Sequence, residues 1–223
     1  MLRSINELPD QKRSETLWTE VNALLAELGM TIRDVNVFSV CTGPGGFTGL
    51  RVGMAAVAGF SVASNKPLIG VTSLEASAFA ARPAALVCSL VNAYKNEVYS
   101  QLFSFDGEGV PVARNVPMVS TLQKALERVA EESELVFAGD GALAEAKRIE
   151  SIAASRGEVT WTTKQSERGL AEDISRLAFL KYARGETQTP ASLKASYVRP
   201  SEAEIKLSLG LLGSKIKRSM KAE

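Results

Sequence analysis

The 223-residue chain contains no histidine. Histidine is the commonest general base and the commonest transition-metal ligand, so its absence excludes Ser-His and Cys-His nucleophile pairs and histidine-based metal sites. The chain has two cysteines, Cys41 and Cys88, far apart and outside any CxxC spacing. We therefore expect both to be small buried hydrophobic residues in a reducing compartment, not a redox or zinc site.

The sequence also lacks a membrane span and a strong net charge. The apolar stretch from Val52 to Asn65 is shorter than the ~20 residues that cross a bilayer, and the N-terminal residues MLRSINELPDQKRSE contain no apolar signal core. Lys and Arg total 26 against 25 Asp and Glu, so no global field attracts the chain to nucleic acid or to an anionic membrane. A cytoplasmic protein without a membrane partner is expected.

What the first part of the chain does contain is a strand-helix-strand pattern. A helix over residues 14–28, ended by Gly29, is predicted by apolar residues at helical spacing: Leu17, Val21, Leu24, Leu25 and Leu28. The β-rich stretch 35–42 suits a strand covered on both faces. A helix over 47–64 and a second strand in 67–73 follow. Two parallel strands joined by a helical crossover are therefore predicted, and the segment 74–82 follows them.

After Pro83 a second block begins. Strands are predicted over residues 84–93, 97–106, 112–120, 134–140 and 158–163, and helices over 121–132, 142–155 and 169–185. A turn is expected near Asp106 and Gly107. This block predicts a mixed sheet with helices, so we divide the chain into a first domain at 1–82 and a second at 83–223 that includes a C-terminal tail.

The loop SVCTGPGGFTG between the first strand and its helix is rich in glycine. It is not a Walker loop, because no Lys-Ser/Thr pair follows at the required spacing, and it fails the GxGxxG pattern at Thr48. The backbone around Gly43, Gly45, Gly46 and Phe47 could still attract an anion at the start of a helix. The alternative is that the glycines only allow a strand to turn tightly into a helix.

The helix after this loop has small residues along one stripe: Gly49, Gly53, Ala56 and Gly59. Glycine within a helix costs ~1 kcal/mol relative to alanine, which argues for a compensating close approach of another backbone. Periodicity alone favours packing inside this chain over a partner interface.

Isolated polar and aromatic residues have simpler interpretations. Glu75, Glu97 and Asp140 are expected to be a helix cap, a cross-strand charge and a turn residue. Trp18 and Trp161 are expected in the core. The basic tail that contains Lys206, Lys215, Lys217, Arg218 and Lys221 is expected to be solvated, with contact to tRNA phosphates as the alternative.

Several motifs together resemble the TsaB (YeaZ) family, which takes part in making threonylcarbamoyladenosine in tRNA. GPGGFTGLRVG is similar to the family signature Gly-Pro-Gly-Ser-Phe-Thr-Gly-Leu-Arg-Val-Gly. RSETLWTEVNALLAELG, GVTSLEASA, NAYKNEVY, FAGDGA and YVRPSEAE follow in the family order over about 190 residues. Ordered motifs over most of a chain are far more specific than a single glycine loop.

The resemblance implies an α/β actin-like, Hsp70-like ATPase (ASKHA) fold of two related domains with mixed sheets. It also implies a non-catalytic dimerisation subunit that binds the transferase TsaD and supports threonylcarbamoyl transfer to the adenosine beside the tRNA anticodon. TsaE is the ATPase partner, a homodimer is the alternative assembly, and tRNA is reached only through the complex. No catalytic residue, metal or cofactor is expected in this chain, with ATP or ADP at most at a partner interface.

Periodicity alone favours packing of the small-residue stripe inside this chain, whereas the resemblance favours its use as the surface that docks TsaD or a second copy. It implies that the small-residue stripe faces a partner together with the first helix. The expected partner-binding residues are Gly49, Arg51, Gly53, Ala56, Gly59, Leu17 and Val21.

The sequence departs from the family pattern at several places. Gly46 replaces the family serine, Arg13 replaces a histidine, and Asn92 and Tyr94 replace Asp and Arg. The strands with which the family opens have no clear counterpart before Arg13, except LRSINEL as a remnant, so we expect an N-terminally truncated first domain or a start codon further upstream.

Two other functions of the same fold are alternatives to the scaffold role. A nucleotide-binding phosphotransferase needs an acidic residue on the absent first strand and a second phosphate loop. A glycoprotease-like peptidase needs metal ligands, and for these the chain offers carboxylates alone.

Overall fold

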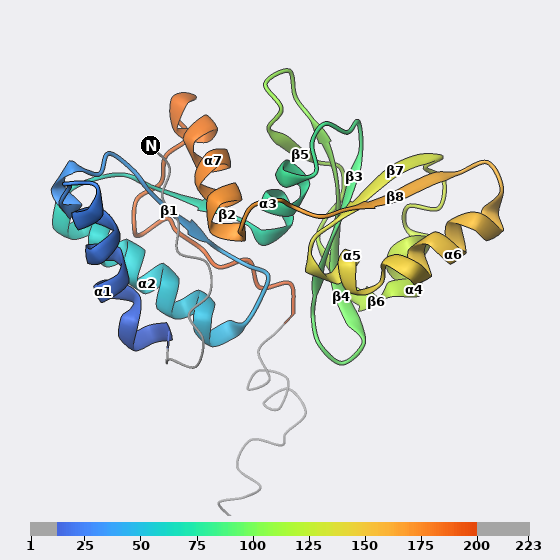
Figure 1. Ribbon diagram of the computed structural model, residues 1–223, viewed down its shortest axis with the longest axis horizontal. Helices are drawn as coiled ribbons and strands as arrows, with labels where there is room; N and C mark the ends of the chain where they lie inside the picture. Colours follow the sequence, from blue (N-terminus) through green and yellow to red (C-terminus); the bar gives the residue numbers. More distant parts are fainter. Residues whose placement is uncertain (1–12, 200–223) are drawn as a thin grey trace, which may run out of the picture.

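The computed structural model describes residues 13–199, and their side chains from Leu17 onward. The described chain forms two lobes, each built on its own β-sheet, with helix α3 (Ser73–Ala80) between them (Figure 1). The LRSINEL remnant and the basic tail lie outside the described residues.

The first lobe contains the predicted strand-helix-strand unit. β1 (Phe38–Cys41) and β2 (Leu68–Val71) pair in parallel, and α2 (Phe47–Ser64) crosses between them. Before them come α1 (Arg13–Glu27) and the short 3-10 helix η1 (Ile32–Asp34). The boundaries of α1 and α2 agree with the prediction to within a residue or two.

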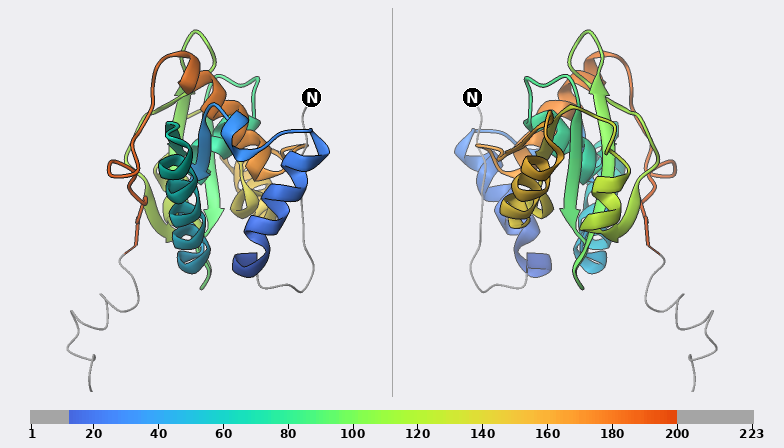
Figure 2. Two further views of the ribbon diagram at one scale, coloured as in Figure 1. Left: turned by 90° about the vertical axis from the view of Figure 1, so that its left-hand side faces the viewer. Right: turned by 90° about the vertical axis from the view of Figure 1, so that its right-hand side faces the viewer.

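β1 is covered on both faces, as its apolar composition predicted. Val40 faces α2, where a methyl on Gly53 would lie 3.9 Å from it. Cys41 packs against the buried cluster to which α7 (Leu170–Ala183) contributes. Figure 2 shows α2 and α7 on opposite sides of this sheet. Alternation of side chains along a strand sends successive residues to the two helices.

The second lobe holds a six-stranded mixed sheet. Its strand order is β5-β4-β3-β7-β8, with β6 also pairing β4; β3 is antiparallel to β4 and parallel to β7. The strands are β3 (Val87–Asn92), β4 (Glu97–Phe105), β5 (Pro111–Ala113), β6 (Met118–Thr121), β7 (Glu134–Ala138) and β8 (Thr160–Lys164). The helices are α4 (Leu122–Glu127), α5 (Asp140–Ala144) and α6 (Ala146–Arg156).

Three predicted elements of this lobe were wrong in detail. The strand expected over 112–120 is two short strands, β5 and β6. The helix expected over 121–132 ends at Glu127. The helix expected over 142–155 begins earlier and is divided at Glu145, whose backbone (φ −107°, ψ 8°) lies outside the helical region.

α7 returns from the second sheet to the first lobe. Its buried Ile174, Leu177 and Ala178 pack with Ile69 and Val71 of β2. The part of the chain expected to form the second domain thus supplies a helix to the first.

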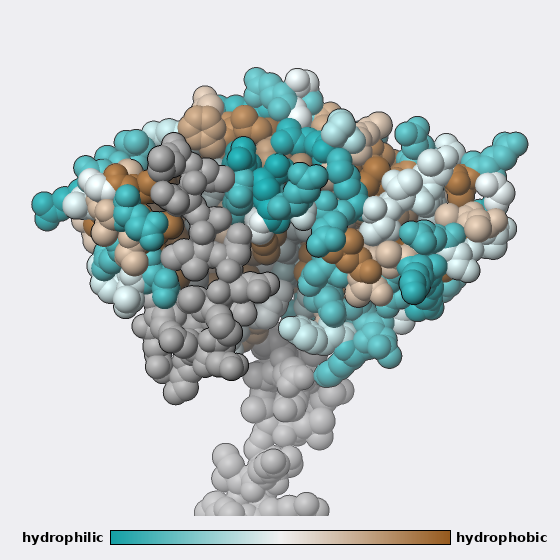
Figure 3. Space-filling view, in the orientation of Figure 1, coloured by the Kyte–Doolittle hydropathy of each residue, from teal (hydrophilic) through white to brown (hydrophobic). Residues whose placement is uncertain are grey.

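The larger core lies in the second lobe. Fourteen buried residues there form one cluster around Leu90, Phe137 and Ile149, and Trp161 packs on Phe137 with ring centroids 5.3 Å apart, which confirms that Trp161 is core. α1 shows no buried residue from Leu17 onward, and α2 buries Ser61 alone. On the face in Figure 3, hydrophilic residues cover most of the second lobe and apolar ones form scattered areas.

Candidate functional site

A cleft of about 1080 Å³ lies between the lobes. Its walls come from the β1–α2 loop and the start of α2, from α3, from the ends of β3 and β7, and from the segment between β8 and α7. The glycine loop singled out in the sequence therefore lies at the cleft, with Gly45 and Gly46 among the lining residues.

The loop is fixed by the strands and helix around it. Gly43 has φ +101°, and a methyl group there would lie 3.0 Å from Leu50 Cδ1 and 3.2 Å from the Ser196 carbonyl oxygen. Ser73 donates its backbone N–H to the Gly43 carbonyl (2.9 Å) and its hydroxyl to the Pro44 carbonyl (2.6 Å). Glycine at position 43 is therefore required by the tight strand-to-helix turn. Anion binding at Gly45, Gly46 and Phe47 stays a prediction.

The charged side chains of the cleft have local partners. Asp173, 2% exposed, accepts hydrogen bonds from Ser166 Oγ (2.6 Å) and Arg168 Nε (3.0 Å). Asp140 accepts the backbone N–H groups of Asn92 (3.1 Å) and Gly141 (2.9 Å). Asp173 therefore fixes the start of α7, and Asp140 fixes β3 against α5.

Two more polar residues are accounted for in the same way. Lys164 Nζ donates to the Arg82 carbonyl at 2.7 Å. Glu75 forms a capping box with Thr72 at the start of α3, as expected of a cap, and pairs with Lys181 at 2.8 Å. Within residues 13–199 no group of three metal-ligating side chains comes together.

The small-residue stripe of α2 divides between two directions. Gly59 is exposed, with nothing within 4 Å of an added Cβ. Gly49, also exposed, and Gly53 line the cleft, Gly53 with Val40 of β1 at 3.9 Å from an added Cβ, and Ala56 is half-buried. The outward surface also carries Val62, which is 70% exposed. Gly53 thus packs on the sheet, and the docking role expected of these four residues stays a prediction.

α1 lies beside this surface. Leu17 and Val21 are half-buried, and the Trp18 ring lies 5.3 Å from the ring of Phe60 on α2. Trp18 is 50% exposed, so its assignment to the core was wrong. One side of its indole packs on α2 and the other faces solvent.

Arg51 is held by two aromatic rings. Its guanidinium lies 3.9 Å from the Phe47 centroid, and its Nε donates to the Tyr197 hydroxyl at 3.1 Å. Tyr197 was missed as a site residue, although it stands in one of the motifs that carried the resemblance. The contact spans 146 positions, which no local pattern predicts.

α2 is, among the described helices, the one long and apolar enough to cross a membrane by length and composition. The prediction that no segment spans a membrane considered only the uncharged part from Val52. The helix as a whole also contains Arg51. Of its 18 residues Ser61 alone is buried and half are partly buried, because one side of the helix packs on β1. A long apolar helix thus lies at the surface of the first lobe.

Comparison with known proteins identifies relatives over most of the chain. Residues 7–205 match the family model described as TsaD, tRNA N6-adenosine threonylcarbamoyltransferase. The chain is 27% identical to the tRNA threonylcarbamoyladenosine biosynthesis protein TsaB of Escherichia coli over 207 residues, covering 90% of this chain and 87% of that protein. It is 26% identical to TsaB of Bacillus subtilis over 190 residues, covering 83% and 79%.

A solved structure gives the same fold. The crystal structure of an uncharacterized Pseudomonas aeruginosa protein with similarity to peptidase YeaZ superposes with a TM-score of 0.69 at 24% identity, covering 86% of each chain. The actin-like (ASKHA) α/β fold with mixed sheets, expected from the sequence, is confirmed by this likeness and by the family model.

Proposed function

Because the chain belongs to the TsaD family, as a member of its TsaB/YeaZ group, we infer that it serves tRNA threonylcarbamoyladenosine biosynthesis as a docking subunit for a TsaD transferase. The role in this biosynthesis follows from the family. The docking role and the absence of catalysis are the proposal.

The observation that carries the docking role is the exposed apolar helix α2. Large exposed apolar surfaces on soluble proteins mark interaction sites, and α2 is an apolar helix in which Ser61 alone is fully buried. At Gly49 and Gly59 the backbone itself is open to an approaching helix, since no heavy atom lies within 4 Å of an added Cβ. Small residues at such positions allow helix axes to approach to about 8 Å.

The neighbouring elements extend this surface. Trp18 of α1 offers a half-exposed indole beside α2, and tryptophan and arginine are enriched among residues that dominate binding energy. Arg51 is exposed and preorganised by Phe47 and Tyr197. We place Leu17 and Val21 with Trp18 at the edge of the interface. The half-buried Gly53 and Ala56 lie at its inner margin.

The proposed lack of catalysis is supported by the residues of the cleft. The sequence has no histidine, and the carboxylates Asp140 and Asp173 are engaged by local hydrogen bonds. We propose a cytoplasmic complex with TsaD, with TsaE as a further partner and a homodimer when TsaD is scarce. tRNA is then reached through the complex, and any ATP or ADP binds at a partner interface.

The test is Gly59→Arg. The new side chain projects from an open surface, so the monomer keeps its fold, but in a close helix contact it overpacks and buries an unpaired charge, costing roughly 3 kcal/mol or about 100-fold in affinity. Co-purification with TsaD and light scattering measure association, and circular dichroism checks the fold.

The matched control is Ala154→Arg, an exposed position on α6 of the other lobe, which should bind as the parent does. Unchanged association of a folded Gly59→Arg chain would contradict docking at α2. The non-catalytic role has a separate test. It would be contradicted if the purified chain turned over ATP or a peptide and a single carboxylate substitution abolished that turnover.

A further inference from the structure

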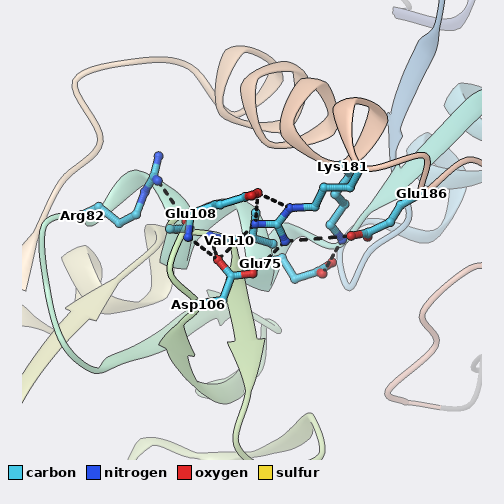
Figure 4. A network of polar contacts seen from close by, with 9 residues as sticks. Glu75, Arg82, Asp106, Glu108, Val110, Lys181 and Glu186 are labelled. Atoms are coloured by element: carbon cyan, nitrogen blue, oxygen red, sulfur yellow. Dashed lines mark hydrogen bonds and ion pairs between the residues drawn. The ribbon is translucent and has the colours of Figure 1, made fainter.

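Charged contacts join the first lobe to both ends of strand β4. At one end, Arg184, the C-terminal cap of α7, donates to Asp106 from Nη1 (2.7 Å) and Nη2 (3.2 Å) and to Glu108 from Nε (2.5 Å) (Figure 4). At the other end, Arg199 pairs with Glu97, the first residue of β4.

Arg199 belongs structurally to the first lobe. The segment after α7 pairs with β2 through Gln188 and Leu68 (2.8 and 3.2 Å), and Ser196 donates its N–H to the Thr42 carbonyl at 2.8 Å. From there the chain reaches β4 of the second lobe. One strand is thus tied to the first lobe at both of its ends.

The tie at Arg184 is preorganised on the carboxylate side. Asp106 Oδ1 also accepts the N–H groups of Glu108 (3.0 Å) and Val110 (2.9 Å), which fixes the β4–β5 turn. Arg82, from the loop after α3, donates to the Gly109 carbonyl in the same turn at 2.9 Å (Figure 4). Two-pronged guanidinium–carboxylate contacts fix orientation as well as distance.

We propose that these contacts form an interlobe clasp, defined by Arg184 with Asp106 and Glu108 and by Arg199 with Glu97, that holds the cleft at a fixed opening. Rotation of one lobe against the other would have to break one end of the clasp. The clasp concerns the chain alone and does not depend on docking of TsaD.

The alternative is that these are ordinary surface ion pairs, which individually contribute little to stability. The two roles differ in what they predict for the cleft. If the contacts are independent surface pairs, removing them changes neither the opening of the cleft nor the access of reagents to it. If they form a clasp at both ends of one strand, removing them increases access to the cleft without unfolding either lobe.

The two cysteines report on this difference. Cys41 lines the cleft and is half-buried, while Cys88 is 1% exposed within the core of the second lobe. Burial raises the pKa of Cys88 to about 12 and raises that of Cys41 as well. Labelling with a thiol reagent at one alkaline pH, with the sites resolved by mass spectrometry, therefore measures cleft opening at Cys41 and unfolding at Cys88.

The variants are Arg184→Ala, Arg199→Ala and the double variant. We expect the double variant to label Cys41 about fivefold faster than the parent, the single variants to lie between, and Cys88 to stay protected. The control is Arg176→Ala on the same helix, whose partner Glu172 lies one turn away on α7 at 2.8 Å; it should label as the parent does. In about 1 M salt, the labelling rate of Cys41 in the parent should also rise, as it does in the double variant.

Two results overturn the clasp. One is an unchanged labelling rate of Cys41 in the double variant and in high salt while Cys88 stays protected. The other is parallel labelling of Cys41 and Cys88, which would mean that the contacts hold the fold together and not the spacing of the lobes.

Discussion

At the scale of single residues, one glycine fixes how closely two strands approach at the cleft. Gly139, after β7, has φ +103°, and a methyl group there would lie 2.4 Å from the Leu90 carbonyl oxygen of β3. Such a contact requires the backbone to move, because neither atom belongs to a flexible side chain. The motif FAGDGA therefore has a structural reason for its glycine at this position.

Gly139→Ala is expected to lower the free energy of unfolding by roughly 2–4 kcal/mol, from the positive φ and the collision with Leu90 together. Urea unfolding measures it. Gly107→Ala is the matched control, since nothing lies within 4 Å of its added Cβ, and it should stay within about 0.5 kcal/mol of the parent. Equal costs for the two substitutions would show that β7 can shift away from β3.

A second residue-scale prediction concerns pH. Hydrogen bonds from Arg184, and then from the N–H of Val110, hold the pKa of Asp106 well below its usual value. Glu108 of the same turn and Glu186 also contact the Arg184 guanidinium, Glu186 at 3.9 Å from the Nη1 that donates to Asp106. A carboxyl whose folded pKa is lowered stabilises the fold above its unfolded pKa, about 4, and loses that contribution as pH falls toward the folded value.

The difference in unfolding free energy between the parent and Asp106→Asn should therefore be constant from about pH 7 to about pH 5 and shrink below about pH 4. Urea unfolding across this range measures it. A difference that shrinks already near pH 6 would exclude the Asp106–Arg184 contact as its source.

At the scale of elements, the sequence predicts what depends on local composition. The β1–α2–β2 unit was predicted correctly because an apolar strand, a glycine loop and a long apolar helix each have a distinct pattern. The division of β5 from β6 was missed because a side chain creates it. Asn115 accepts the Leu102 N–H through Oδ1 at 3.0 Å, and its carbonyl accepts from Gln101 at 2.8 Å. These bonds replace strand pairing in the middle of the segment.

The candidate site shows the same limit on α2. Periodicity identified the stripe of small residues but could not say which members meet the sheet, since close packing on a strand and on a partner helix require the same side chains. Gly53 packs on Val40, and Gly59 faces outward. The position of a neighbouring strand, and not the helix sequence, makes this distinction.

At the scale of the whole molecule, contacts between distant segments determine the arrangement of the lobes. Arg184 and Asp106 are 78 positions apart, and Arg199 and Glu97 are 102 apart. The return of α7 to the first lobe likewise depends on buried residues of two segments, which is why a boundary drawn in the sequence at Pro83 separates the sheets but not the helices.

The unequal cores of the lobes lead to a final prediction. The first lobe has a two-stranded sheet, no buried side chain in the described part of α1, and only Ser61 buried in α2. The second has six strands and the fourteen-residue cluster around Phe137.

Because local opening is easiest where few apolar contacts are lost, amides of α1 and α2 should exchange with solvent deuterium at least about 100-fold faster than those of β3 and β7. Native-state exchange followed by mass spectrometry measures the rates. Adding TsaD should then slow α1 and α2 but not α6, since docking covers only the first lobe. Protection of α2 equal to that of β3 in the isolated chain would mean that this helix is already covered, and the surface assigned to TsaD would not be free.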